Sequence, residues 1–296
     1  MNTRLLSLLL FPALALGQGN SAGGAYAKIP THAVIAALED VAVVKPGDIG
    51  AIGMNPANVF THGSHTSVAF SHAEWIQGIS GQRLSTSFPL PVGRLALGAA
   101  ITTVAGIELR DQPGPALGTF DAKSAVLSAS WGLPVSDGIV AGIAASYLYE
   151  KLYVYESTGF GLDVGALAQT PVDGLTIGAS LVNAGQMSAF RRDVVDIPTT
   201  LRFGGMYRLE SGSLTLEPAL SIRQELHDRE FGVAAGATAL YQNLVGVRFS
   251  WRSGETARSL GFGLMSAYGG LGLEYSLVPI SSGLGTAHMI TVLAHF

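Results

Sequence analysis

The sequence of 296 residues contains no cysteine. Disulfides, thiolate metal sites and a lipid-anchored cysteine are therefore excluded. Charged residues make up only 13% of the chain, about half of the ~25% that is usual in soluble domains. The formal net charge of −4 lacks the basic excess of nucleic-acid-binding proteins, so no nucleic-acid partner is expected. Lysine is especially scarce, with only Lys28, Lys45, Lys123 and Lys151.

Long unbroken hydrophobic runs are also missing. The mean hydropathy of +0.38 would favour membrane helices, which need about 20 consecutive apolar residues. The uncharged segment 231–247 is interrupted by glycine, glutamine and asparagine, and the segment 275–296 by Pro279 and a Ser-Ser-Gly turn. Low charge without a long apolar helix favours a transmembrane β-barrel, whose signal in each segment is weak.

The first residues have the pattern of a secretory signal. Arg4 supplies the positive charge, 5–16 an apolar segment, and Ala15-Leu16-Gly17 a cleavage site of small residues. We therefore predict a signal peptide over 1–17 and export to the bacterial outer membrane. The alternative is a short membrane anchor, although the apolar segment is too short to span a bilayer.

Tight and loose connections alternate from about His65 to the C-terminus. Tight turns occur at 91–93, 134–138 and 171–174, and looser loops at 110–122, 154–158, 186–197, 224–229, 253–257 and 280–285. This rhythm predicts an all-β fold, a transmembrane antiparallel up-and-down barrel over 63–296 with its looser loops facing outward. The fourteen expected strands are 65–75, 78–89, 92–109, 123–133, 138–154, 158–170, 175–184, 198–210, 213–224, 230–241, 244–253, 258–266, 269–279 and 286–296.

Alternation within the strands separates a charged face from an apolar one. In 245–252, Arg248 and Arg252 fall opposite Val247, Phe249 and Trp251. An arginine on the lipid face near the midplane costs about 2–4 kcal/mol, so the charged face must line the lumen. Such charges could line a passage or hold an anionic head group, but pairing that braces the barrel against a plug is the favoured interpretation. The predicted lumenal charges are Asp163, Arg202, Arg208, Glu217, Arg223, Arg248, Arg252 and Glu274.

An apolar segment precedes the first strand. Residues 33–44 are interrupted only by Glu39 and Asp40, and a second apolar segment covers 48–58. Such a segment is unsuited to water, so we expect 18–62 to pack inside the barrel as a hatch. An extra periplasmic cap or a disordered tail are the alternatives.

The motif Asn55-Pro56-Ala57, just before the first strand, resembles the hatch motif of the FadL-like superfamily of outer-membrane barrels, the fatty-acid transporters. The segment 197–204, Ile-Pro-Thr-Thr-Leu-Arg-Phe-Gly, resembles the entry to a mid-barrel strand in that superfamily. The compact, glycine-rich strands are most similar to its PorV/PorQ branch, associated with type IX secretion. The terminal Phe296 resembles the signal that the barrel-assembly machinery recognises.

The resemblance implies two functions, neither of them enzymatic. The PorV/PorQ branch implies a component of protein secretion or surface export that acts through secreted proteins or secretion-system subunits. The wider superfamily implies uptake of a hydrophobic small molecule past the hatch. A structural barrel without a substrate is a third possibility. For the first function, the outward loop 186–197 is the candidate partner surface, with Phe190, Arg191 and Arg192; the alternative is a plain solvated loop.

Histidines provide little support for catalysis or metal binding. His288 and His295 differ in strand parity, and the adjacent Ser71 and His72 point apart. His65 and His72, seven residues apart, also face opposite sides of a continuous strand, whereas zinc needs three or four converging ligands. We therefore expect no enzyme activity, no metal and no cofactor. Apart from the partners already named, only outer-membrane lipid is expected to contact the wall.

Overall fold

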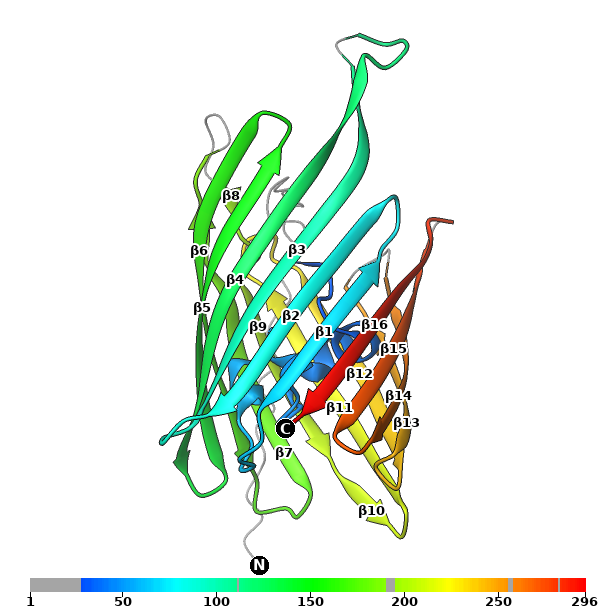
Figure 1. Ribbon diagram of the computed structural model, residues 1–296. Helices are drawn as coiled ribbons and strands as arrows, with labels where there is room; N and C mark the ends of the chain where they lie inside the picture. Colours follow the sequence, from blue (N-terminus) through cyan, green and yellow to red (C-terminus); the bar gives the residue numbers. More distant parts are fainter. Residues whose placement is uncertain (1–27, 111, 190–194, 255–257, 282) are drawn as a thin grey trace, which may run out of the picture.

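The chain forms a single antiparallel barrel wrapped around a short helical segment (Figure 1). The computed structural model describes residues 28–110, 112–189, 195–254, 258–281 and 283–296. The helical segment comprises α1 (Ala33–Leu38) and the 3₁₀ turns η2 (Glu39–Val43), η3 (Ile49–Ala51) and η4 (Pro56–Val59). No helix of the described residues is long and apolar enough to cross a membrane. The strands are β1 (Ser67–Glu74), β2 (Ile79–Pro89), β3 (Arg94–Leu109), β4 (Gly118–Ser136), β5 (Ile139–Leu152), β6 (Tyr155–Gln169), β7 (Leu175–Met187), β8 (Val195–Asp196), β9 (Thr200–Tyr207), β10 (Leu209–Ser211), β11 (Leu214–Glu225), β12 (Phe231–Tyr241), β13 (Val245–Arg252), β14 (Leu260–Tyr268), β15 (Leu271–Ile280) and β16 (Gly285–His295).

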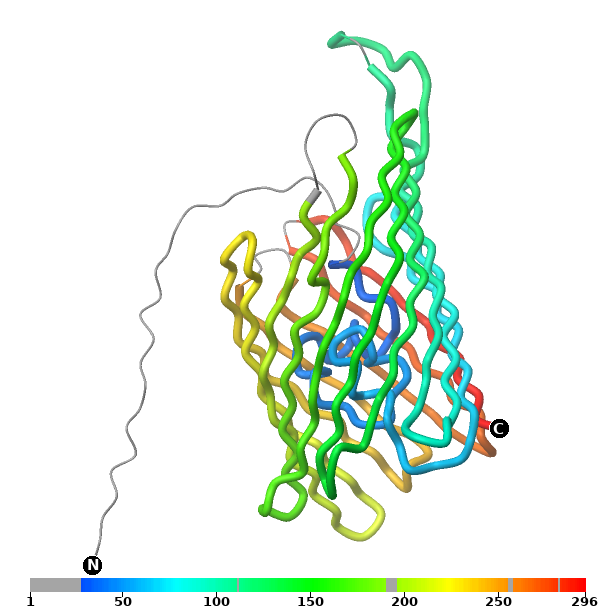
Figure 2. Tube along the Cα trace, turned by 90° about the vertical axis from the view of Figure 1, so that its left-hand side faces the viewer, coloured from blue at the N-terminus to red at the C-terminus, as the bar shows by residue number. Residues whose placement is uncertain are grey.

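Closure of the sheet confirms the predicted fourteen-stranded barrel. β8, β9 and β10 are three parts of one wall strand, because β8 and β9 both pair with β7, and β9 and β10 both pair with β11. The last strand returns to the first, with Ser67 of β1 opposite His295 of β16. Both ends of the barrel therefore lie at the end of the short turns, and the longer loops lie at the opposite end (Figure 2).

Several of the expected loops are shorter than predicted; in 186–197, Gln186 and Met187 belong to β7, and Val195–Asp196 form β8. The expected loop 154–158 is a tight turn, because Leu152 of β5 already pairs with Tyr155 of β6. The connection expected over 110–122 loses its last five residues to β4, which begins at Gly118. Both hairpins extend past the neighbouring strands at the long-loop end (Figure 1). Outside the membrane the lipid-facing side of a strand no longer has to be apolar, so the sequence pattern does not mark where such a strand ends. Pairing that continues beyond the membrane is thus invisible to an argument from hydrophobicity.

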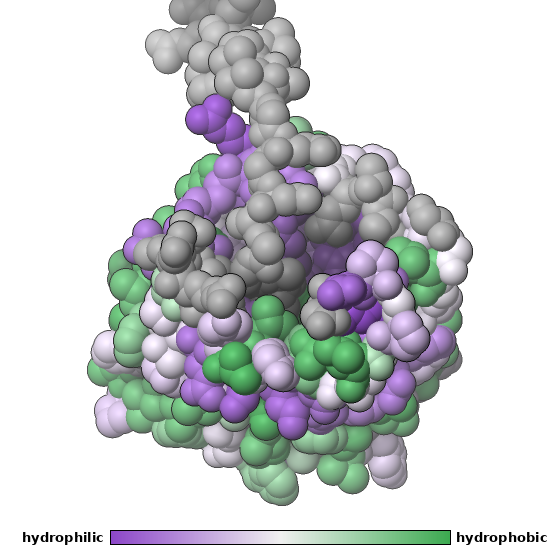
Figure 3. All heavy atoms as spheres, turned by 90° about the horizontal axis from the view of Figure 1, so that it is seen from above, coloured by the Kyte–Doolittle hydropathy of each residue, from purple (hydrophilic) through white to green (hydrophobic). Residues whose placement is uncertain are grey.

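The two faces of the wall differ as parity predicts. In β13, Val247, Phe249 and Trp251 are exposed on the outside, while Arg248 and Arg252 are buried inside. Figure 3 shows hydrophobic residues over the outer surface and hydrophilic ones around the mouth. Because unpaired backbone groups are costly in lipid, the closed sheet with an apolar exterior is a membrane-spanning wall.

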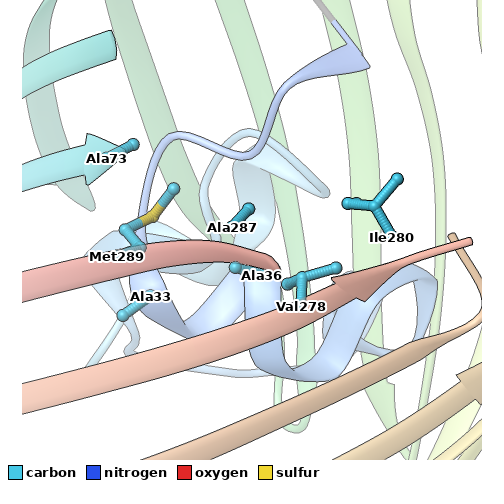
Figure 4. Packing of buried hydrophobic residues seen from close by; sticks show 7 residues of the cluster. All are labelled: Ala33, Ala36, Ala73, Val278, Ile280, Ala287 and Met289. Carbon is cyan, nitrogen blue, oxygen red and sulfur yellow. The ribbon is translucent and has the colours of Figure 1, made fainter. Parts of the chain in front are cut away.

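The helical segment fills the middle of the lumen and buries apolar side chains against the inner wall. One cluster joins Ala33 and Ala36 of α1 to residues of β1, β15 and β16 (Figure 4), namely Ala73, Val278, Ile280, Ala287 and Met289. In β16 the inner face is apolar where it meets this segment: Met289 is 2% exposed, and Leu293 packs against the cluster of Ile49 and Ile52. Residues 28–66, called the hatch from here on, thus account for the apolar residues on the inner face of the last strand.

Candidate functional site

The Asn55-Pro56-Ala57 motif fixes the hatch to β5 and β6. The Asn55 side chain accepts a hydrogen bond from the Ala57 N–H at 3.0 Å and caps η4. Its amide donates to the carbonyl of Val43 at 3.0 Å and to that of Ala166 in β6 at 3.1 Å. All polar atoms of the amide are thereby satisfied in a fully buried site, as burial requires. Asn58 plays a similar part within the hatch, donating to the carbonyls of Ala42 and Ala51.

Two wall glycines provide the space for this motif. A Cβ atom at Gly142 of β5 would lie 2.2 Å from the Ala57 nitrogen, and one at Gly165 of β6 would lie 2.0 Å from the Asn55 Oδ1. Distances under 3.0 Å do not occur for real Cβ atoms. Glycine is therefore required at both positions if the hatch backbone is to touch the wall.

The acidic residues Glu39 and Asp40 of the hatch are held by arginines of the wall. Asp40 Oδ1 pairs with Arg202 Nε of β9 at 2.9 Å, and its Oδ2 with Arg223 Nε of β11 at 3.3 Å. Arg252 of β13 lies 3.1 Å from Glu39 Oε2 and 3.8 Å from Asp40 Oδ2. Arg258, just before β14, completes the set at 3.4 Å from Glu39 Oε1. Every charge in this cluster, called the ion lock from here on, is largely removed from water.

Opposing effects set the pKa of Asp40. Burial alone raises the pKa of a carboxyl group, but the guanidinium groups of Arg202, Arg223 and Arg252 outweigh it and hold the pKa of Asp40 below its usual value. The carboxylate is therefore ionised throughout the neutral range. The ion lock thus joins the hatch to four separate places on the wall by charge.

A second group of charges lies nearer the short turns. Arg248 pairs with Glu274 of β15 at 2.9 Å and approaches Asp48 of the hatch at 3.8 Å. Glu217 of β11 pairs with Arg208 at 2.8 Å and also with Lys45 of the hatch. In this second group, ion pairs between two wall residues lie next to ion pairs between the wall and the hatch.

The predicted lumenal charges have different surroundings. Glu217 pairs with Arg208, and Glu274 with Arg248, within the wall. The remaining three arginines of the prediction contact the acidic residues of the hatch. Asp163 lies outside both groups, and its carboxylate accepts the Asn183 N–H at 2.6 Å at a bulge between β6 and β7.

Other predicted residues lie at the margins of the structure or beyond it. The signal peptide 1–17 and the candidate partner residues Phe190, Arg191 and Arg192 lie outside the described residues. Phe296 is exposed, and its backbone pairs with Thr66 at the seam of the barrel. Among the described residues, no group of three or more His, Asp or Glu side chains is placed to hold a metal ion.

A buried histidine connects the hatch to the opposite side of the wall. His32 precedes α1 and contacts the hydroxyl of Ser71 in β1 through Nδ1 and that of Ser85 in β2 through Nε2, the latter at 3.1 Å. Ser71 in turn lies 2.7 Å from the Thr291 hydroxyl, which accepts the Ala33 N–H at 3.0 Å. Ser71 thus has a histidine partner from the hatch, but both side chains are shut off from solvent, and their role is to hold the hatch.

Burial, together with the nearby Arg83 guanidinium, lowers the pKa of His32 well below its ordinary value of 6.5. The unfolded chain takes up a proton below pH 6.5 while the native imidazole stays neutral, so the stability from this site is complete above pH 6.5 and declines below it. We expect His32→Gln to remove part of the acid sensitivity of thermal unfolding, up to about 1.4 kcal/mol per pH unit. Unfolding temperatures between about pH 7.5 and 5 test this. His72→Gln, on the outer face of β1, must keep the wild-type slope; an equal change in both variants would contradict the prediction.

The hatch separates cavities at the two ends of the lumen. On the long-loop side, a cavity of about 160 Å³ lies against Ile35, Ile52 and Met54 of the hatch. Its walls come from β2 to β7, β9, β11 and β13, and they include the ion lock. Two further cavities, of about 570 and 490 Å³, lie on the short-turn side and share no lining residue with the first. The hatch therefore lies between the cavity on the long-loop side and the two cavities on the short-turn side.

Several residues of this site escaped the sequence analysis. Arg83, Arg258, Lys45 and His32 were not singled out, because each is an isolated charge or ring with no motif around it. Glu39 and Asp40 did carry a signal, since they are the only charges in an apolar segment. A buried charge needs a partner, so these two residues could have been matched to the excess arginines on the inner face.

Comparisons with known proteins show a likeness of fold. No family model and no curated protein matches the chain. Among solved structures, the toluene transporter TodX of P. putida is similar, with a TM-score of 0.56, 10% identity and coverage of 84% of this chain and 93% of that one. A FadL homologue from Pseudomonas aeruginosa gives a TM-score of 0.55 at 10% identity, covering 90% and 98%. The toluene transporter TbuX of Ralstonia pickettii gives 0.52 at 13% identity, covering 84% and 92%.

These neighbours are barrels of the outer-membrane FadL and TodX type, which supports the broad part of the resemblance found in the sequence. The narrower likeness to the PorV/PorQ branch gains no support from them.

Proposed function

We propose that this protein is an outer-membrane uptake channel, closed by its hatch, for a small and largely hydrophobic molecule. The observation that carries the proposal is a cavity of about 160 Å³ resting directly on the hatch inside a closed fourteen-stranded barrel. Transporters of toluene and a FadL homologue share this architecture. A ligand that enters past the long loops would come to rest on the hatch.

The cavity suits a compact ligand. An apolar cavity of about 150 Å³ is enough to bind benzene, so the space above the hatch fits a molecule of one ring or a short chain. Ile35, Ile52 and Met54 form an apolar floor, and Val126 and Leu148 an apolar patch on the wall. An apolar body would gain about 25 cal/mol for each Å² that it buries there.

The barrier below the cavity is built to be moved. Ion pairs, hydrogen bonds and small apolar contacts hold the hatch, and none of them is covalent. No disulfide joins hatch to wall, because the chain has no cysteine. For a ligand to pass, these non-covalent contacts between hatch and wall would have to break. The ligand would then enter the cavities on the short-turn side.

The secretion role implied by the PorV/PorQ resemblance is less well supported. Its candidate partner surface at Phe190, Arg191 and Arg192 lies outside the described residues. The solved neighbours are a better match to uptake than to secretion.

Two neighbouring alanines test the channel. Ala144 of β5 faces the cavity, whereas Ala145 faces lipid. We expect Ala144→Trp to fill the cavity and reduce toluene uptake by cells carrying the protein at least tenfold, and Ala145→Trp to leave uptake unchanged. The measurement is the initial rate of labelled toluene uptake, with the amount of folded barrel equalised on gels. Equal rates for both variants, or no uptake above cells without the protein, would sink the proposal.

A further inference from the structure

A single arginine of the cavity differs from all the others. Arg83 of β2 lines the cavity, and among the described residues no carboxylate lies within ion-pair distance of its guanidinium. Its contacts are serine hydroxyls: Nε donates to Ser85 Oγ at 3.2 Å and Nη2 to Ser128 Oγ at 3.3 Å. An arginine stays charged in a protein, so its positive charge is present permanently.

The wall is shaped to hold this guanidinium against it. Gly98 of β3 lies opposite both Ser85 of β2 and Ser128 of β4. A Cβ atom at Gly98 would lie 2.8 Å from Arg83 Nη2 and 2.7 Å from Ser128 Oγ. The missing side chain thus lets the guanidinium cross β3 and reach Ser128. Hydrogen bonds to Ser85 and Ser128 therefore hold the Arg83 guanidinium in place at the edge of the cavity.

The balance of charge around the cavity is positive. Six basic and four acidic side chains line it, and the acidic ones already have contacts. Glu39 and Asp40 are engaged in the ion lock, and Glu225 pairs with Lys28 at 3.0 Å. Asp163 interacts electrostatically with both Arg83 and Arg202, and its carboxylate accepts the Asn183 N–H.

Arg202 adds a second donor. Its Nη1 is buried and has no hydrogen-bond partner among the described residues, although its Nε is paired with Asp40. A buried N–H without a partner is unfavourable, so an anion that accepts a hydrogen bond from Nη1 would satisfy it.

We propose, building on the proposed channel function, that the ligand is a compact organic acid whose carboxylate binds Arg83 and whose ring or short chain lies on the apolar floor. A guanidinium presents a planar fork of donors that matches a carboxylate in two parallel hydrogen bonds. The space beside Arg83 holds about 160 Å³, which fits one ring or a short chain, and a second cavity of about 420 Å³ shares Lys28, Thr102 and Arg258 with it. A neutral hydrocarbon would offer the Arg83 guanidinium no acceptor at ion-pair distance, and its side-chain contacts would remain the serine hydroxyls.

Binding at Arg83 would also change a contact that holds the hatch. Ser85 Oγ accepts from Arg83 Nε and lies 3.1 Å from the His32 ring, which holds the start of α1. A carboxylate that draws the guanidinium into the cavity weakens its bond to Ser85, and the serine is shared with the hatch. The ligand site and the anchor of the hatch are therefore adjacent.

The experiment compares three probes of similar size: toluene, benzyl alcohol and benzoate. Binding to purified wild-type protein in detergent is measured by calorimetry, and then repeated with Arg83→Gln. We expect wild type to bind benzoate more tightly than benzyl alcohol, and Arg83→Gln to lose about ten- to a hundredfold of benzoate affinity. Affinity for toluene should change less than threefold. Arg110→Gln, which removes an exposed cation near the mouth, should leave all three values unchanged.

Each outcome has a distinct meaning. Equal binding of benzoate and toluene in wild type and in Arg83→Gln overturns the inference while the channel function stands. Failure of all three probes to bind counts against the channel function itself. If Arg83→Gln does not fold, Gly98→Ala keeps the charge but crowds the guanidinium, and it must lower the ratio of benzoate to toluene affinity. An unchanged ratio there would also refute the role of Arg83.

Discussion

Replacing Asp40 by asparagine is expected to unseat the hatch while leaving the barrel closed. Asparagine has nearly the shape of aspartate, so the change removes charge rather than volume. Arg202, Arg223 and Arg252 would then each lose their ion pair with Asp40. Removing one partner of a buried ion pair costs about 3–5 kcal/mol, because the other charge is left buried and uncompensated. The other contacts of the hatch, through Asn55, His32 and small apolar residues, do not compensate these buried guanidinium groups, so we expect the hatch to be released.

The absence of cysteine gives a direct readout of hatch position. Ser250 of β13 is 0% exposed and donates to the Ala37 carbonyl of α1 at 2.8 Å. A Ser250→Cys change places one thiol beneath the seated hatch. We expect it to react slowly with a water-soluble maleimide in the parent protein and at least tenfold faster when Asp40→Asn is added. Conductance across planar bilayers should rise in parallel.

A surface ion pair provides the matched control. Glu156 pairs with Lys151 at 3.0 Å on the exposed end of the β5–β6 hairpin. Exposed pairs contribute about 0–1 kcal/mol, so Glu156→Gln should leave both thiol reactivity and conductance unchanged. Slow labelling in the Asp40→Asn protein, with no rise in conductance, would show that the ion lock does not hold the hatch.

The barrel could be predicted from the sequence because each strand carries its own signal. In β13, one parity holds Val247, Phe249 and Trp251 and the other holds Arg248 and Arg252, and lipid tolerates only the first set. The turns then give the number of strands. Where hairpins leave the membrane this signal ends, since both faces meet water, and the tight turn between Leu152 and Tyr155 could not be foreseen.

The partners of the lumenal charges were harder to predict. Parity places Arg202, Arg223 and Arg252 inside the lumen but says nothing of what lies opposite them. Their partners come from the hatch, which is distant in sequence, and this pairing depends on how a short irregular segment docks. Arg83 shows the same limit, because its lack of a carboxylate becomes visible only once every neighbour is placed.

Substitution of a wall glycine should have an effect as large as loss of the ion lock, by steric means. A Cβ atom at Gly165 would lie 2.0 Å from Asn55 Oδ1, and one at Gly142 would lie 2.2 Å from the Ala57 nitrogen. The Asn55 amide cannot retreat without losing its bonds to Val43 and Ala166. We therefore expect Gly165→Ala to release the Asn55-Pro56-Ala57 segment, with the Ser250→Cys thiol labelled at least tenfold faster.

Gly161 is the matched control for this change. It lies on the same inner face of β6, four residues before Gly165, but a Cβ atom there would meet only Ile197 Cδ1 at an ordinary 3.5 Å. Gly161→Ala should therefore keep the hatch seated and the thiol slow to react. Both changes add one methyl group to the same strand, so any general weakening of the wall should be equal in the two proteins. A difference in their labelling rates therefore reports the contact between residue 165 and the hatch. Equal labelling in the two proteins would mean that the motif can be displaced without releasing the hatch.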